Sequence, residues 1–126
     1  MIKENYVSLW LGHFESNDDF NNYIEVKYDA DGNSIISPFQ NDFGIVKYNY
    51  DTTESDWISE SCTDVNTLLA GFSYDETIIS KFDNIISTNK LENYNSILLL
   101  YNFEFEMNTN NNNAKMDYIG CVSYIN

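Results

Sequence analysis

The stretch SILLLYNFEFEM, residues 96–107, predicts the central strand of a β-sheet. It begins as a continuous apolar run, which is typical of a strand that is covered on both faces. From Phe103 onward, apolar residues alternate with Glu104 and Glu106. We therefore expect the sheet to become half-exposed toward the end of this strand.

Three other segments show strand patterns. Residues 5–12, NYVSLWLG, alternate with a period of two and predict a first strand inside the sheet. Residues 115–125, KMDYIGCVSYI, resume the alternation after the polar residues 108–114. We expect the last two strands to form a long hairpin around that polar loop. A short strand is also expected over residues 43–48.

Three amphipathic helices are predicted from apolar residues at helical spacing. The first follows Ser16 and Asp19, which resemble a capping box. The second covers residues 65–72. The third begins at the S-x-x-E capping box of Ser73 and Glu76, and these two helices are expected to share one surface.

The order of these elements predicts an α+β fold. Helices on one face of a mainly antiparallel sheet form the economical arrangement for strand, helix, strand, two helices, strand, strand. The 126 residues fit a single domain, residues 1–126, and a hydrophobic content of 43% supplies its core. Trp10 is assigned to the packing of the first strand.

The charge balance excludes several classes of partner. Six lysines face 20 Asp and Glu residues, the formal net charge is -14, and the chain contains no arginine. Nucleic-acid binding depends on cations that neutralise phosphates, and anionic membranes attract the same cations. The sequence therefore predicts no nucleic-acid or membrane partner, whereas a basic protein would be attracted.

The segment NYDTTESDWISES, residues 49–61, concentrates this negative charge, since no lysine occurs between Lys47 and Lys81. A solvated loop or short helix would explain the acids alone. A large aromatic residue among acids is, however, typical of an interface anchor. The pattern leaves open whether Trp57 is exposed or packs in the core. The candidate partner-binding residues are Asp51, Glu54, Asp56, Trp57, Glu60 and Asp64.

No motif for a cofactor, metal or catalytic centre was found. The single histidine, His13, excludes multi-histidine metal sites and is interpreted as an exposed loop residue. The segment DADGN, residues 29–33, departs from a calcium loop because Ser34 and Gln40 stand where glycine and glutamate are required, so it predicts a turn. We therefore predict no catalytic residue, no cofactor and no metal.

Two further features concern the compartment. The apolar run near the N-terminus is too short for a signal peptide, and no segment approaches the length that spans a membrane, which predicts a cytoplasmic protein. Cys62 and Cys121 are accordingly expected to be free thiols.

Six segments together resemble the immunity protein 22 family, and they occur in the order of that family. They are SLWLGHF at 8–14, SPF at 37–39, DFGI at 42–45, YNYD at 48–51, LLAGFSY at 68–74 and ILLLYNFEF at 97–105. The resemblance implies an antidote that binds and neutralises a cognate toxin of a bacterial polymorphic toxin system. It does not imply catalysis.

The charge and the resemblance lead to one functional prediction. We expect an immunity protein whose acidic surface binds a basic toxin, with a nuclease as the favoured class because its cationic cleft would complement that surface. Two alternatives stay open: an acidic protein-protein interaction module without a toxin, and a carboxylate-dependent hydrolase. The oligomeric state is left open as well.

Overall fold

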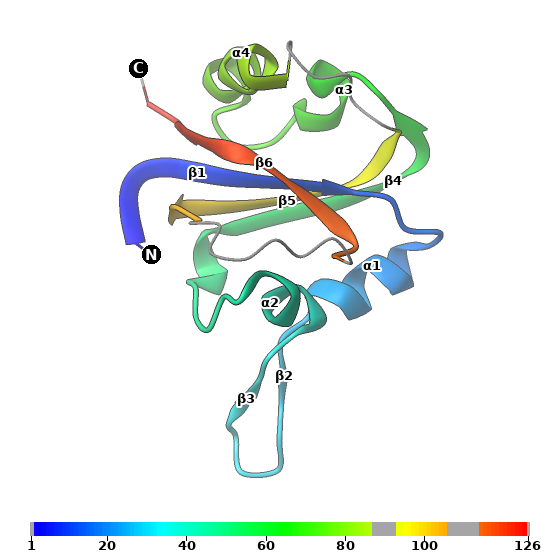
Figure 1. The fold of residues 1–126 in the computed structure, drawn as a ribbon, viewed down its shortest axis with the longest axis vertical. Coiled ribbons are helices and arrows are strands. Elements are labelled where there is room, and N and C mark those ends of the chain that lie inside the picture. The colour runs from blue at the N-terminus through cyan, green and yellow to red at the C-terminus, as the bar shows by residue number, and fades with distance from the viewer. Residues whose placement is uncertain (1, 87–92, 106–113, 126) are drawn as a thin grey trace.

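The chain folds around a four-stranded antiparallel sheet in the order β4-β5-β1-β6 (Figure 1). The computed structural model describes residues 2–86, 93–105 and 114–125. The strands of this sheet are β1 (Ile2–Gly12), β4 (Thr53–Cys62), β5 (Tyr94–Phe103) and β6 (Met116–Ser123). The helices are α1 (Asn17–Ile24), α2 (Pro38–Phe43), α3 (Val65–Leu69) and α4 (Asp75–Ile86). A small hairpin of β2 (Lys27–Tyr28) and β3 (Ser34–Ile35) and a 3₁₀ turn, η1 (Tyr50–Thr52), complete the described elements.

The α+β class and the antiparallel sheet are confirmed, and β5 occupies a central position as predicted. The predicted hairpin of the last two strands is wrong, because β1 lies between β5 and β6 and pairs with both. The reason is the burial of β1, whose residues 7–12 are fully enclosed and belong inside the sheet. A period of two identifies strands but not their neighbours. The polar segment 108–114 falls almost wholly outside the described residues.

The helices cover both faces of the sheet, and the expectation that they lie on one face is wrong (Figure 1). Both β1 and β5 are apolar at successive positions, so both of their faces need cover. Helices α3 and α4 enclose what we call the aliphatic core: Val7, Leu9, Leu11, Val65, Leu68, Leu69, Ile78, Phe82, Tyr94, Ile97, Leu99, Tyr101 and Val122. Helices α1 and α2 enclose the aromatic core: Trp10, Phe14, Phe20, Tyr23, Phe39, Ile45, Tyr48, Leu98, Leu100, Phe103 and Met116.

The segment from Ser37 to residue 49 contains no strand, so the strand predicted over residues 43–48 is wrong. Ser37 and Gln40 form a capping box that starts α2, with Pro38 in its first turn, and Gly44 ends the helix in a left-handed conformation. The irregular segment that follows is supported by Gln40, whose amide donates to the carbonyl oxygens of Ile45 and Val46 at 3.2 Å each.

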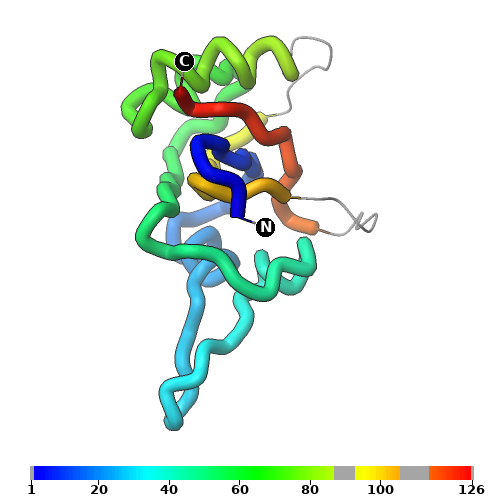
Figure 2. Tube along the Cα trace, turned by 90° about the vertical axis from the view of Figure 1, so that its left-hand side faces the viewer, coloured from blue at the N-terminus to red at the C-terminus, as the bar shows by residue number. Residues whose placement is uncertain are grey.

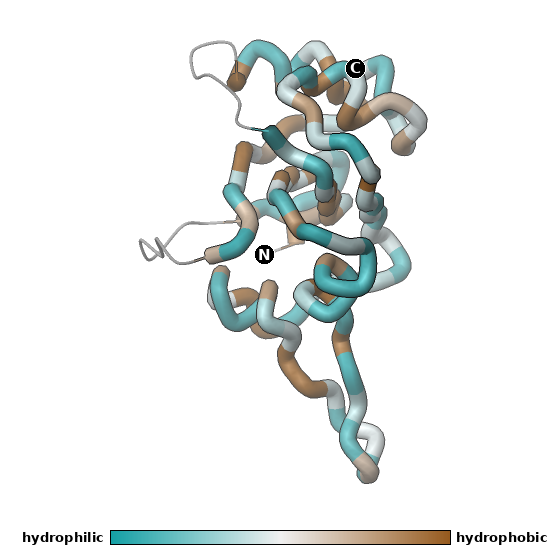
Figure 3. Tube along the Cα trace, turned by 90° about the vertical axis from the view of Figure 1, so that its right-hand side faces the viewer, coloured by the Kyte–Doolittle hydropathy of each residue, from teal (hydrophilic) through white to brown (hydrophobic). Residues whose placement is uncertain are grey.

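The predicted turn at residues 29–33 is confirmed. Asp29 Oδ1 accepts the backbone N–H groups of Asp31 and Asn33, and Gly32 has a φ of 83°. The turn closes the β2–β3 hairpin, which projects from the rest of the molecule (Figure 3). Ile35, in β3, and Ile36, between the hairpin and α2, are both exposed. The hairpin is therefore an exposed region that lies away from the four-stranded sheet.

Candidate functional site

The acidic segment forms an edge strand, and not the loop or short helix that would have explained its acids alone. β4 pairs with β5 from Thr53 to Trp57 and lies at the end of the strand order. Figure 2 shows it, in green, along the left margin of the sheet. Edge strands tolerate polar and charged residues because one side of the strand faces solvent. The segment therefore lacks the apolar alternation that identified the other strands.

The strand places Trp57 and its acidic neighbours on opposite faces. Glu54 and Asp56 lie opposite Leu99 and Ile97, which belong to the aliphatic core. Trp57 points the other way, since side chains alternate along a strand, and it packs against the aromatic core. The structure thus does not bring the predicted tryptophan and these carboxylates together in one cluster.

Trp57 is half-buried, which answers the question of whether it is exposed or part of the core. Its indole Nε1 donates to the carbonyl oxygen of Phe14 at 3.0 Å. This bond ties β4 to the segment that follows β1. The ring therefore has a structural role on the α1/α2 face, and only its exposed part is left for a partner.

The Glu54 carboxylate is occupied within the protein. It accepts hydrogen bonds from the backbone N–H of Ser73 at 3.0 Å and from the Ser73 hydroxyl at 2.9 Å. The Tyr101 hydroxyl lies 2.8 Å from Glu54 Oε1. Burial raises the pKa of Tyr101, and the bond to Glu54 adds to this effect. Ser73 therefore bonds to Glu54 and does not form the predicted capping box with Glu76. Helix α4 begins at Asp75.

Asp64 is exposed and caps α3. Its carboxylate accepts from the Thr67 hydroxyl at 3.0 Å and from the backbone N–H of Asn66 at 3.1 Å. These bonds, with that of Thr67 the stronger cause, lower the pKa of Asp64. The side chain therefore keeps its negative charge at neutral pH while it holds the start of α3.

Four carboxylates are left exposed along β4 and its two ends, and we call them the acidic edge: Asp51, Asp56, Glu60 and Asp64. None of them forms an ion pair with a described lysine, since the ion pair found in residues 2–86, 93–105 and 114–125 joins Lys3 and Glu104 at 2.8 Å. Uncompensated charges of one sign on one strand attract cations. The arrangement can bind a basic surface.

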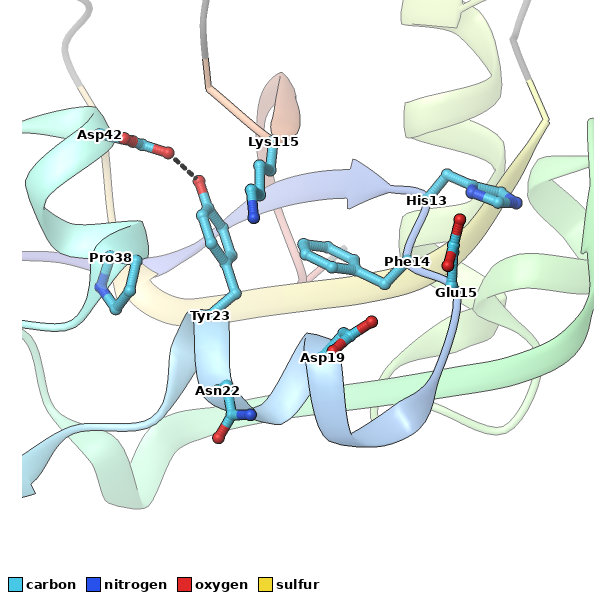
Figure 4. Close-up of a pocket in the computed structure, with 9 residues that line it drawn as sticks. All are labelled: His13, Phe14, Glu15, Asp19, Asn22, Tyr23, Pro38, Asp42 and Lys115. Carbon is cyan, nitrogen blue, oxygen red and sulfur yellow. Dashed lines mark hydrogen bonds between the residues drawn. The ribbon is translucent and has the colours of Figure 1, made fainter.

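A hollow of about 720 Å³ bears on the hydrolase alternative, because it is lined by Glu15, Asp19 and Asp42 (Figure 4). Asp42 accepts a hydrogen bond from the Tyr23 hydroxyl at 2.6 Å, the dashed line in Figure 4. Glu15 and Asp19 are exposed, and a catalytic acid requires an apolar setting that raises its pKa. The hollow therefore gives a hydrolase mechanism no support. His13 is exposed, as predicted.

A second hollow, of about 730 Å³, opens at the start of β4 and was missed by the sequence reasoning. Tyr48, Tyr50 and Tyr101 line it. Tyr50 directly precedes Asp51 in the chain. Burial raises the pKa of Tyr48 to about 12, while Tyr50 is 41% exposed. The alternating tyrosines of YNYD, residues 48–51, were the available signal. The rings suit contact with the stem of a long side chain, and the lining carries one charge of each sign, at Lys47 and Glu4.

No group of three or more His, Cys, Asp or Glu residues in the described part of the chain could hold a metal ion. Cys62 and Cys121 are free thiols, as predicted. None of the described helices has the length and apolar character needed to cross a bilayer.

The comparison with protein families identifies the chain. The family model described as Immunity protein 22 matches residues 7–124, and the chain therefore belongs to this family. The match includes β4 and the whole acidic edge. No curated protein and no solved structure matches the chain. Its general role is thus that of an immunity protein, which neutralises a toxin partner, and the family indicates a protein other than an enzyme.

Proposed function

We propose that this immunity protein neutralises a basic toxin by binding it through the acidic edge. The observation that carries the proposal is the set of exposed carboxylates at Asp51, Asp56, Glu60 and Asp64, which lack a lysine partner among the described residues. Glu54, Trp57 and Asp64 hold the local structure through their hydrogen bonds. The charges are therefore presented from a fixed strand, which reduces the entropy lost on binding.

The net charge of the whole chain supports the same partner chemistry. A formal charge of -14 produces a field that steers basic proteins toward the surface and raises the association rate. Fast association suits an antidote, because the toxin has to be captured before it acts. Close charge pairs in such a complex are coupled by roughly 1.5 to 7 kcal/mol each.

The toxin class that fits this surface best is a nuclease. A nuclease binds the phosphates of its substrate through lysine and arginine side chains. The acidic edge presents carboxylates to the same cations, so it would compete with the substrate for the cationic cleft. The protein would act in the cytoplasm, where the nucleic acid is found.

The first test is co-expression with the product of the adjacent gene. We expect that product to arrest growth when expressed alone, and this protein to restore growth and to co-purify with it. Failure of every neighbouring gene product to be toxic or to form a complex would overturn the proposed function in favour of an interaction module without a toxin.

The second test places the site. The double variant Asp56→Lys and Glu60→Lys should lower the association rate at low salt by at least about tenfold and flatten its salt dependence. The matched control is Asp31→Lys with Asp83→Lys, which are exposed in the hairpin turn and in α4. Each pair moves the net charge from -14 to -10, because every acid-to-lysine change adds two charges. Equal association rates for the two variants would remove the acidic edge as the site.

A further inference from the structure

The two edges of the sheet differ in how they are covered. Helix α4 packs against β6: the Lys81 ammonium donates to the carbonyl oxygens of Ser123 at 2.8 Å and Ile125 at 3.1 Å, and Ile85 lies against Gly120. No described strand pairs with the outer side of β4 or of β6, the two edge strands, but α4 packs mainly against β6. An uncovered edge strand is a template for pairing with another chain.

The backbone of β4 shows which groups face outward. The Thr53 N–H donates to the carbonyl oxygen of Tyr50, and the Trp57 N–H donates to Asp56 Oδ1 at 2.9 Å. Both donors thus bond local acceptors in place of β5. Because backbone groups alternate between the two sides of an antiparallel strand, the N–H of Ser55 also points away from β5. Ser55 is exposed.

We propose that β4 accepts an extended segment of the basic toxin as an added strand, which pairs with the backbone of Ser55 and Trp57. The inference rests on the proposed function and specifies how the partner binds there. Strand addition supplies affinity through backbone hydrogen bonds, and side chains at alternate positions supply specificity. The bound toxin segment would become the fifth strand of the sheet.

The charges of β4 determine which kind of strand can pair with its outer side. Residues 53–62 contain Glu54, Asp56 and Glu60 and no lysine. Pairing with β4 of a second copy would set carboxylates against carboxylates, and like charges opposite one another destabilise a strand pair. A segment with lysine or arginine at alternate positions places opposite charges there instead. The structure therefore favours a toxin segment over a second copy of this chain.

The Asp56 carboxylate takes part both in the acidic edge and in the backbone hydrogen bonds of β4. In the free protein its carboxylate accepts the outward N–H of Trp57, which blunts the open edge. In the complex a carbonyl oxygen of the added strand takes over this N–H. The Asp56 carboxylate is then released to pair with a lysine or arginine of the toxin.

Amide hydrogen exchange tests the backbone contact directly. The probe is the inactivated toxin domain that co-purifies in the co-expression experiment, and exchange is followed by NMR in the free and bound protein. We expect the Ser55 and Trp57 amides to exchange at least about tenfold more slowly in the complex, with the exposed Asp31 amide as the unchanged reference. Unchanged exchange at Ser55 and Trp57 in a formed complex would overturn strand addition.

Variants at Ser55 provide a second readout. Ser55→Pro removes the outward donor, which an edge strand tolerates, and should weaken binding at least about tenfold. Ser55→Ala keeps the donor and should stay within about twofold. If the proline variant fails to fold, hydrogen exchange of the unmodified complex decides.

The outcomes separate the two proposals. Loss of binding in Asp56→Lys with Glu60→Lys, together with full binding by a folded Ser55→Pro, would retain the acidic edge and reject the added strand. Full binding by both variants would reject the site itself. A dimer of the free protein in light scattering that Ser55→Pro abolishes would assign the edge to a second copy and reject the toxin segment.

Discussion

The two faces of the sheet are filled by different kinds of side chain. The aliphatic core lies under α3 and α4, whose buried residues recur at helical spacing. The aromatic core contains rings from α1, from the six-residue α2 and from the irregular segment after it. Trp10 packs edge-on to Phe39 with a centroid separation of 5.0 Å and an interplanar angle of 90°. Two helices with regularly spaced apolar residues are enough to fill the aliphatic core. The aromatic core is filled instead by large rings, several of which come from chain segments without regular structure.

The comparison explains how β4, the strand of the proposed site, is held in place. β4 is bonded to the aromatic side through Trp57 and Phe14, and to the aliphatic side through Glu54 and Ser73. These two attachments use side chains on opposite faces of one strand. They leave Asp56 and Glu60 directed at solvent, so the cores on both sides determine where the acidic edge lies.

The largest effect is expected from the aromatic core. Trp10→Ala should lower the free energy of unfolding by about 3 to 5 kcal/mol, because the ring is 0% exposed and leaves a large cavity. Its indole N–H has no hydrogen-bond partner among the described residues, so packing accounts for its contribution. Urea unfolding followed by circular dichroism measures the change.

The matched substitution on the other face is Leu99→Ala, also at a side chain that is 0% exposed, with an expected loss of about 2 to 5 kcal/mol. A stable Trp10→Ala variant that fails to bind the toxin would contradict the comparison. Trp10 would then serve binding, and the roles assigned to the two tryptophans would be reversed.

Glu54 tests how β4 is attached on the aliphatic side of the sheet, where its carboxylate bonds Ser73 just before α4. Glu54→Ala should destabilise by about 1 to 3 kcal/mol, because the buried Tyr101 hydroxyl and the Ser73 N–H lose their acceptor. The control is Asp56→Ala on the same face of the strand, which is exposed and should change stability by less than about 0.5 kcal/mol. Similar losses in both variants, measured by thermal unfolding, would show that Glu54 does not anchor the strand.

The sequence predicted those parts of the fold whose residues follow a simple period. β5, β1 and the α3–α4 pair are apolar at regular spacing, and the Ser16 cap and the turn at Asp29 use local chemistry. The hairpin of the last strands was wrong because nothing in a period specifies that β1 inserts between them. Helix α2 was missed although Ser37, Pro38 and Gln40 carry its start signal, because the apolar residues after it resembled a strand.

The sequence grouped the acids with Trp57 but could not give their arrangement in space. The pleat of a strand divides them between two faces. The bond from Glu54 to Ser73 joins residues 19 positions apart, and that from Trp57 to Phe14 joins residues 43 apart. Contacts of this range depend on the complete sheet. They decide which acids stay free for a partner.

The smallest expected effect concerns Asp64, at the far end of the acidic edge, and its sign depends on pH. The pKa of this carboxyl is lowered in the folded protein, so its stabilising contribution is present above the ordinary value of 3.8 and is lost as the pH falls through the lowered pKa. Asp64→Asn keeps a side chain that can cap α3 but cannot titrate.

The melting temperature of the unmodified protein minus that of Asp64→Asn should therefore be constant from neutral pH to about pH 5 and should shrink below about pH 4. Thermal unfolding across this range measures the difference, and the other carboxylates cancel because both proteins contain them. A difference that stays constant to pH 3 would mean that the charge of Asp64 does not stabilise α3.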